Sequence, residues 1–164
     1  MQTESIKFKE IPTRNVNFVG ALTFDNNGKL YIMINQGIDN MGRQNFTIAH
    51  ELGHYFLNHL LNSTSFFCQE SQIVEEANVT NSIEHEANYF ASCFLMPKQK
   101  ITSAFFGMLK YSHRAKNKDF LVVNKTSFGI WCNIRDSLTK RYGVSEAALR
   151  YRLNKLMLLQ FEFL

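Results

Sequence analysis

The 164-residue chain is predicted to be an α+β protein, with a small twisted β-sheet followed by packed helices. Residues 16–24 and 29–35 are apolar runs typical of strands. Residues 25–28 between them, Asp-Asn-Asn-Gly, supply the Asn and Gly that favour a hairpin turn. Beyond a connecting loop at 37–42 the apolar spacing becomes helical. The predicted helices span residues 43–59, 82–96, 126–142 and 145–159.

The first predicted helix carries His50-Glu51-Leu52-Gly53-His54. On a helix, His50 and His54 project from the same face, so both imidazoles can reach one Zn²⁺ at about 2.0–2.1 Å. Glu51 lies beside the first histidine, where its carboxylate can accept a proton from an attacking water. An apolar stripe that includes Phe46 and Ala49 indicates that this helix packs on a core. The alternative is a pair of solvated histidines beside a glutamate.

A catalytic zinc needs three protein ligands and one open position. The metzincin spacing would require a histidine at position 60, where this chain has Leu60. His59 is one residue away, and we interpret it as a helix C-terminal histidine facing the helix dipole rather than as a ligand.

The second predicted helix offers two carboxylates as the third ligand. Glu84 shares a face with the small residue Ala87, which would allow close packing against the first helix, whereas Glu86 lies on another face. Glu84 is therefore the preferred ligand, and Asn88 one turn later is a candidate to orient a histidine. Ser82 can cap this helix, and Pro97 fits just past its end.

Charge is distributed unevenly between two predicted domains. Residues 1–97 carry 5 Lys/Arg and 10 Asp/Glu, whereas residues 98–164 carry 13 and 4, so balances of −5 and +9 give the net +4. The acidic part suits a cation site. The basic helical part suits an anionic partner, either nucleic acid or an acidic protein surface, although a merely solvated basic surface explains it equally well.

Composition also predicts a location. No run of 18 or more apolar residues exists, so no transmembrane helix is expected, and the N-terminal residues lack the pattern of a signal peptide. Cys68, Cys93 and Cys132 are widely spaced without a CxxC pair, which indicates free thiols in a reducing cytoplasm. Cys93 falls in a helical pattern and is expected to be a core residue.

Two motifs together resemble the ImmA/IrrE family of zinc metallopeptidases. They are the segment 46–54, Phe-Thr-x-Ala-His-Glu-x-Gly-His, and the segment 84–97, Glu-x-x-Ala-Asn-x-Phe-Ala-x-x-Phe-Leu-Met-Pro. Phe94 departs from the family's usual Leu. The C-terminal segment 138–156 is also similar to the family's helical end, so the resemblance covers about residues 16–158.

This resemblance implies a gluzincin-like fold, in which a twisted sheet lies over two active-site helices. It also implies a zinc site with His50, His54 and Glu84 as ligands and Glu51 as general base. Known members are associated with cleavage of helix-turn-helix repressors of mobile elements or stress genes. The implied substrate is therefore a protein, and the expected reaction is hydrolysis of a peptide bond.

Other roles are less sharply indicated. Tyr89, His85 and His113 are all candidates for stabilising an oxyanion, and the strand at 29–35 is a candidate to pair with an extended substrate. The rival interpretations are a binding or regulatory protein with a non-catalytic zinc site and a DNA-binding regulator.

The last two predicted helices have the spacing of a helix-turn-helix, with Gly143-Val144 at the turn and Ser145 as N-cap. Arg150, Arg152 and Lys155 on the second of these helices are candidates for partner binding, including weak contact with phosphates. The Leu-rich face of the same helix equally predicts an ordinary packed helical hairpin, which we favour.

Overall fold

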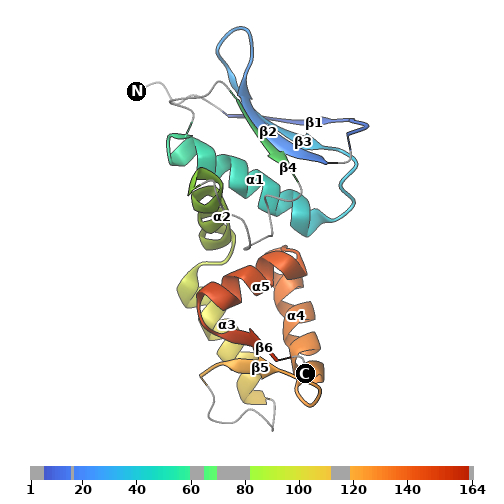
Figure 1. The fold of residues 1–164 in the computed structure, drawn as a ribbon, viewed down its shortest axis with the longest axis vertical. Helices are drawn as coiled ribbons and strands as arrows, with labels where there is room; N and C mark the ends of the chain where they lie inside the picture. The colour runs from blue at the N-terminus through green and yellow to red at the C-terminus, as the bar shows by residue number, and fades with distance from the viewer. Residues whose placement is uncertain (1–5, 16, 60–64, 70–81, 112–118, 163–164) are drawn as a thin grey trace. The chain divides into compact units, whose positions relative to one another are not determined.

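The computed structural model describes residues 6–15, 17–59, 65–69, 82–111 and 119–162. Its five helices and two sheets confirm the α+β class (Figure 1). The chain forms two compact units, Met1–Ala91 and Ser92–Leu164. Among the described residues no helix is long and apolar enough to cross a membrane.

The N-terminal unit contains a four-stranded sheet of order β1-β3-β2-β4. Its strands are β1 (Lys7–Ile11), β2 (Phe18–Phe24), β3 (Leu30–Asn35) and β4 (Ser65–Gln69). The predicted hairpin is confirmed, since β2 and β3 pair antiparallel. Its turn is held by the Asp25 carboxylate, which accepts hydrogen bonds from the backbone N–H groups of Asn27 and Lys29, and Gly28 supplies the positive φ of 75°.

The two outer strands were not assigned from the sequence. β1 pairs parallel with β3, and the sequence Lys-Phe-Lys-Glu-Ile leaves it almost wholly exposed. An exposed outer strand carries little of the apolar alternation by which strands are recognised, and its lysines are typical of a sheet edge. β4 pairs antiparallel with β2. It falls in the polar segment 62–82, whose lack of a clean period predicts one short element at most.

Helix α1 (Met41–Phe56) packs on the sheet, against β2, β3 and β4. The Asn40 side chain caps its start by accepting a hydrogen bond from the Arg43 N–H at 3.0 Å. The predicted helix 43–59 was three residues too long at its C-terminal end, because Asn58 adopts a positive φ of 59°. This left-handed residue ends the helix and turns the chain back, a conformation that asparagine tolerates better than most residues.

Helix α2 (Ser82–Leu95) lies against α1 (Figure 1). A Cβ built on Gly53 would come within 3.1 Å of the Ala87 Cα and 3.2 Å of the Ala87 carbonyl oxygen. It would also lie 3.2 Å from the Phe90 ring. The two helices therefore approach as closely as the small residues on the predicted faces suggested, and glycine at position 53 permits it.

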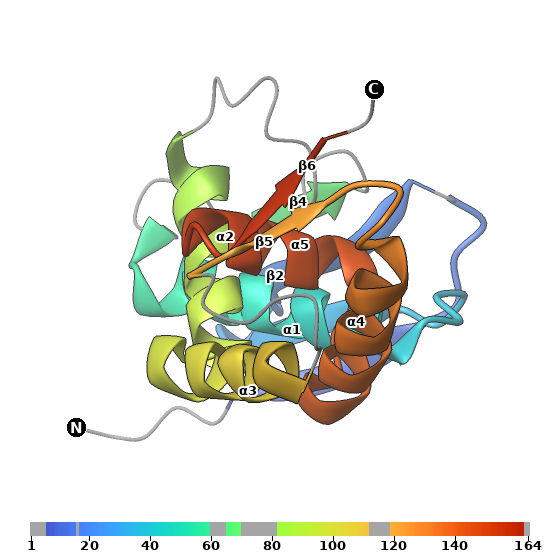
Figure 2. The same ribbon diagram turned by 90° about the horizontal axis from the view of Figure 1, so that it is seen from below.

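The C-terminal unit is helical with a two-stranded parallel sheet (Figures 1 and 2). Helix α4 (Phe128–Tyr142) and the start of α5 (Glu146–Lys155) follow the prediction, with Gly143 in the left-handed conformation and Ser145 as N-cap. The predicted C-terminal end of the last helix was wrong, because Leu159 belongs to a strand. The remaining elements were not predicted and are α3 (Lys98–Tyr111), β5 (Leu121–Val123) and β6 (Leu159–Phe161).

Helix α3 begins directly after Pro97 and buries Ile101, Phe105 and Leu109, which recur every four residues. Three-residue strands such as β5 and β6 have no usable sequence period, since they exist only by pairing with each other. Residues 111–119 are rich in Lys and Arg, which predicts a basic loop, but they lie largely outside the described residues.

We expect Gly53→Val to destabilise the protein by about 1–3 kcal/mol, because the new side chain meets the backbone of α2 rather than a movable side chain. Gly107→Val is the matched control. Gly107 lies in the exposed part of α3, and among the described residues nothing beyond its own helix backbone lies within 4 Å of its Cβ position, so the free energy of unfolding should change by no more than about 0.5 kcal/mol. Urea denaturation followed by circular dichroism compares the two, and equal effects would contradict the close packing.

Candidate metal centre

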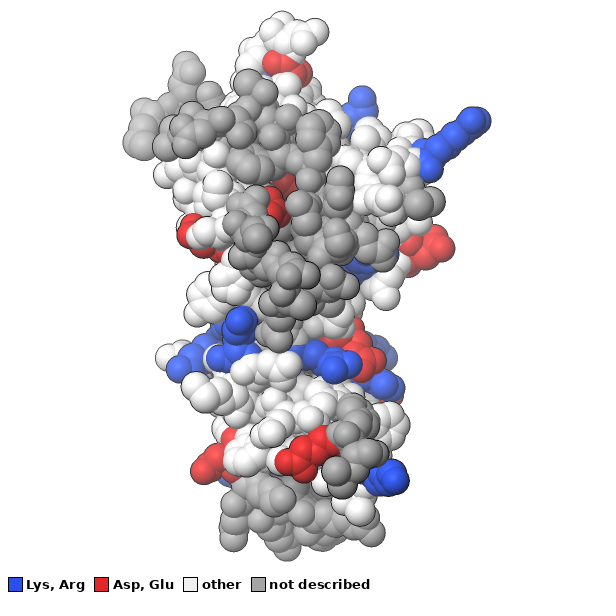
Figure 3. All heavy atoms as spheres, in the orientation of Figure 1, with Lys and Arg blue, Asp and Glu red and all other residues white. Residues whose placement is uncertain are grey.

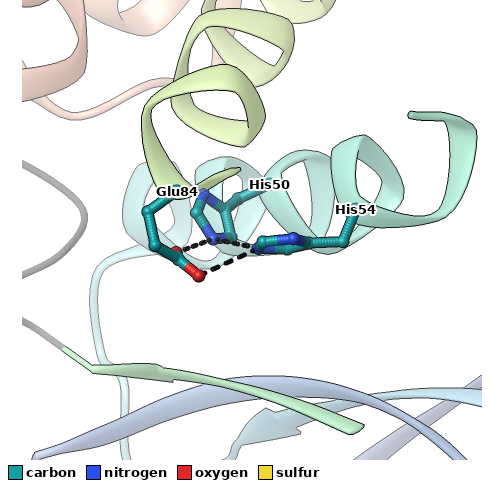
Figure 4. A group of neighbouring side chains, drawn as sticks. All are labelled: His50, His54 and Glu84. Atoms are coloured by element: carbon teal, nitrogen blue, oxygen red, sulfur yellow. Dashed lines mark hydrogen bonds and ion pairs between the residues drawn. The ribbon is translucent and has the colours of Figure 1, made fainter. Parts of the chain in front are cut away.

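Three side chains from α1 and α2 converge on one point (Figure 4). The His50 Nε2 lies 3.0 Å from the His54 Nε2 and 3.1 Å from the Glu84 Oε2, and the His54 Nε2 lies 3.5 Å from the Glu84 Oε1. A tetrahedral zinc with ligand bonds of about 2.0–2.1 Å has ligand atoms about 3.3–3.4 Å apart. The three separations, of which the two from histidine run to different oxygens of Glu84, are close to this spacing, and His and Glu are residue types that zinc binds.

The site is removed from solvent, and its carboxylate is charged. His50, His54 and Glu84 are all buried. Burial raises the pKa of Glu84, but the neighbouring His50 and His54 side chains outweigh this effect and bring the pKa to about 2. Burial lowers the pKa of His54, and the neighbouring Glu84 offsets this only in part. An ionised Glu84 beside a His54 that favours the neutral form is the protonation state that metal binding requires.

The outer nitrogen of His50 is held by the second helix. Its Nδ1 lies 2.9 Å from the Asn88 side-chain oxygen, which can only accept a hydrogen bond. The proton of a neutral His50 is thereby placed on Nδ1, and Nε2 is left bare and directed at Glu84 and His54. The structure thus puts Asn88 where the sequence expected an orienting residue.

Glu51 is completely buried on α1, next to the first histidine. Within the described residues neither of its carboxylate oxygens has a hydrogen-bond partner of good geometry. Burial raises the pKa of Glu51 well above its ordinary value, the Glu84 charge adds to this, and the backbone of Leu22 opposes it in part. A buried carboxylate without a partner is costly, and a cation with its bound water would satisfy it.

His59 has a contact that the sequence analysis missed. Its Nδ1 lies 3.0 Å from the His54 Nδ1, and its Nε2 lies 3.3 Å from the Glu86 Oε2. His59 follows the end of α1 instead of capping it, because the left-handed Asn58 folds it back onto His54. The one available signal was an asparagine, a residue that tolerates positive φ, directly before the histidine.

The proposed oxyanion donors differ in exposure. Tyr89 is half exposed and His85 is partly buried. His113 lies outside the described residues. The strand predicted to receive a substrate is β3, which is hydrogen-bonded to β1 on one side and β2 on the other. That expectation is wrong, because an interior strand has no open edge.

Arg152 was one of three basic residues predicted to bind a partner, and its burial contradicts that prediction. It is only 3% exposed, and its guanidinium donates to the Met96 carbonyl at 3.0 Å and the Cys93 sulfur at 3.1 Å. Its role is to fasten α5 to the end of α2 within the C-terminal unit. Arg150 and Lys155 are exposed, over the rings of Phe161 and Tyr151 respectively.

In chelator-treated protein we expect Glu51→Gln to be more stable than the wild type at neutral pH. The folded state raises the pKa of Glu51, so between the unfolded and folded pKa values the folded protein holds the extra proton and its free energy of unfolding falls as pH rises. The variant lacks this loss, which amounts to about 1.4 kcal/mol per pKa unit. Denaturation from pH 4 to 8 measures the difference, and parallel profiles would contradict the buried carboxylate.

Comparison with known proteins supports the same chemistry. Residues 8–154 match the Peptidase_M78 family, described as the IrrE N-terminal-like domain, and no curated protein matches the chain. The match spans both helices that supply the three buried ligands, and the family supports a metallopeptidase-type function. The resemblance read from the two motifs is thus confirmed, and the chain belongs to the Peptidase_M78 family of IrrE N-terminal-like proteins.

Proposed function

We propose that the protein is a zinc-dependent endopeptidase. The observation that carries this proposal is the convergence of His50, His54 and Glu84 at zinc-like separations beside the buried carboxylate of Glu51. Three protein ligands leave a fourth position open, as in catalytic zinc sites, whereas structural sites are closed by four. A purely structural site would also have no use for a buried acid next to its first ligand.

Each side chain has a defined part in this reaction. When bound, zinc acts as a Lewis acid that polarises the substrate carbonyl and makes water acidic enough to attack near neutral pH. Glu51 accepts the proton of the attacking water and later delivers it to the leaving amine. Burial raises the pKa of Glu51 above its ordinary value, which helps the carboxylate to hold the proton between these two steps.

We further propose that the substrate is a helix-turn-helix repressor of a mobile element or stress response. The family supports a protein substrate, and its known members motivate the repressor. In this assignment residues 1–97 form the catalytic part, and the basic residues 98–164 hold the substrate, with DNA contact secondary. Arg150 and Lys155 are exposed for this role, and Lys and Arg side chains gather at the level of α5 in Figure 3.

The same proposal places the protein in the cytoplasm. Cys93 and Cys132 are free thiols, as expected where disulfides are not maintained. An extended substrate would pair with an outer strand of the sheet, and in the described sheet those strands are β1 and β4.

We expect His50→Ala and Glu84→Ala to lose most of their bound zinc, because each removes one of three ligands and leaves the others too few to hold the metal. The purified proteins are compared by metal analysis after dialysis against a fixed free zinc concentration. Glu10→Ala, which removes an exposed carboxylate from β1 of the same unit, is the matched control and should keep about one zinc per chain. Full occupancy in Glu84→Ala would refute the ligand assignment.

Glu51→Gln should bind zinc normally but cleave its substrate about 10²–10⁴-fold more slowly, since the amide has the same shape and cannot accept a proton. The assay incubates the zinc-loaded protein with the helix-turn-helix regulator encoded beside it and follows the fragments by mass spectrometry, with and without chelator. Undiminished cleavage by the variant would refute the general-base role of Glu51.

Reversing charge at Arg150 and Lys155 to glutamate should slow cleavage of the regulator by roughly tenfold or more at low ionic strength, because a basic surface accelerates encounter with an anionic partner. Hydrolysis of a short neutral peptide and zinc content should stay unchanged. Glutamate at Arg14 and Lys29, which are exposed and lie outside the strands, makes the same charge change elsewhere and is the control. Equal cleavage by both double variants and the wild type would remove the proposed docking surface.

A further inference from the structure

A chain of polar contacts leads from the candidate metal centre to the surface. It starts at the His54 Nδ1, passes through both ring nitrogens of His59, and reaches the carboxylate of Glu86. The His59 side chain is 7% exposed and that of Glu86 is 54% exposed, so this series of contacts reaches the solvent at Glu86. The second oxygen of Glu86 accepts a hydrogen bond from the Ser82 hydroxyl at 3.1 Å, at the start of α2.

The carboxylate of Glu86, at the outer end of this series of contacts, determines which nitrogen donates the hydrogen bond at each step. An ionised carboxylate can only accept, so the His59 Nε2 must carry a proton and donate it to Glu86. A neutral His59 then has a bare Nδ1, which can only accept a hydrogen bond. The His54 Nδ1 is therefore the donor at the 3.0 Å contact, and the bare nitrogen of His54 is Nε2. That nitrogen is the one directed at Glu84 and at the His50 Nε2.

The opposite arrangement would block the site. If His59 carried its proton on Nδ1, the His54 Nδ1 would have to accept, and a neutral His54 would then be protonated on Nε2. That proton would point into the place that the metal should occupy. The two ligand histidines thus reach the same tautomer by different means, since His50 is fixed by the Asn88 amide oxygen and His54 by a histidine backed by a carboxylate.

We infer that His59 and Glu86 are positioning residues for the metal ligand His54, with Glu86 selecting the tautomer of His59 and His59 selecting that of His54. This inference rests on the proposed zinc site. Groups that orient a metal-bound histidine typically change metal affinity by about 10–100-fold when removed. Glu86, which the sequence analysis weighed as a rival ligand, acts two steps from the metal in this arrangement.

The test measures the zinc Kd of full-length variants by competition with a chromophoric chelator. His59→Ala should weaken zinc binding by about 10–100-fold. His59→Asn should recover most of the loss, because its side-chain oxygen can take the place of the accepting Nδ1. Glu86→Ala should weaken binding in the wild-type background but not in His59→Asn, where no tautomer remains to be selected. Glu10→Ala, an exposed carboxylate of the same unit, should leave the Kd unchanged.

Two results would overturn the inference. One is a His59→Ala Kd within twofold of the wild type. The other is an equal effect of Glu86→Ala in both backgrounds, which would mean that Glu86 acts through its charge alone. A long-range ¹H–¹⁵N spectrum of the zinc-loaded wild type needs no substitution, and it should show His59 protonated on Nε2 only. Failure of the wild type to bind zinc would instead refute the proposed function, so the two failures are distinguishable.

Discussion

The close approach of α1 and α2 is the contact on which the rest of the site depends. Gly53 occupies the turn between the two histidines, and the backbone of Ala87 lies against it. At this separation Glu84, one turn before Ala87, reaches both imidazoles, and Asn88 reaches the far nitrogen of His50. A larger side chain at position 53 would hold the second helix away from the first. The smallest residue in the motif therefore sets the distances between the chemically active ones.

Burial at this helix contact affects the protonation of the two carboxylates, Glu84 and Glu51. The two neighbouring histidines keep Glu84 ionised despite its removal from water, whereas burial and the Glu84 charge raise the pKa of Glu51 well above its ordinary value. Two carboxylates in one buried place are thus pushed toward opposite protonation states by their different neighbours. A cation between them changes this balance, because it stabilises the charged form of both.

The predictable part of this protein is the part encoded by local spacing. Three features can be recognised from the sequence of a single helix or turn. They are the i, i+4 histidines, the shared face of Glu84 and Ala87, and the Asp-Asn-Asn-Gly turn. What could not be predicted depends on contacts between elements. The interior position of β3 follows from pairing with β1, and the burial of Arg152 follows from a carbonyl fifty-six residues away. His59 was dismissed because its spacing was judged along a continuous helix, which Asn58 in fact terminates.

The ligands come from two helices, and His54 and Glu84 are thirty positions apart in the chain. A metal bound between them would therefore be a reversible cross-link that closes a long loop. Such a closure removes conformational freedom from the unfolded chain and adds stability in proportion to the logarithm of the metal concentration. The persistence of the folded enzyme would then follow the supply of zinc. A cell short of the metal would hold less of the protein as well as less of its activity.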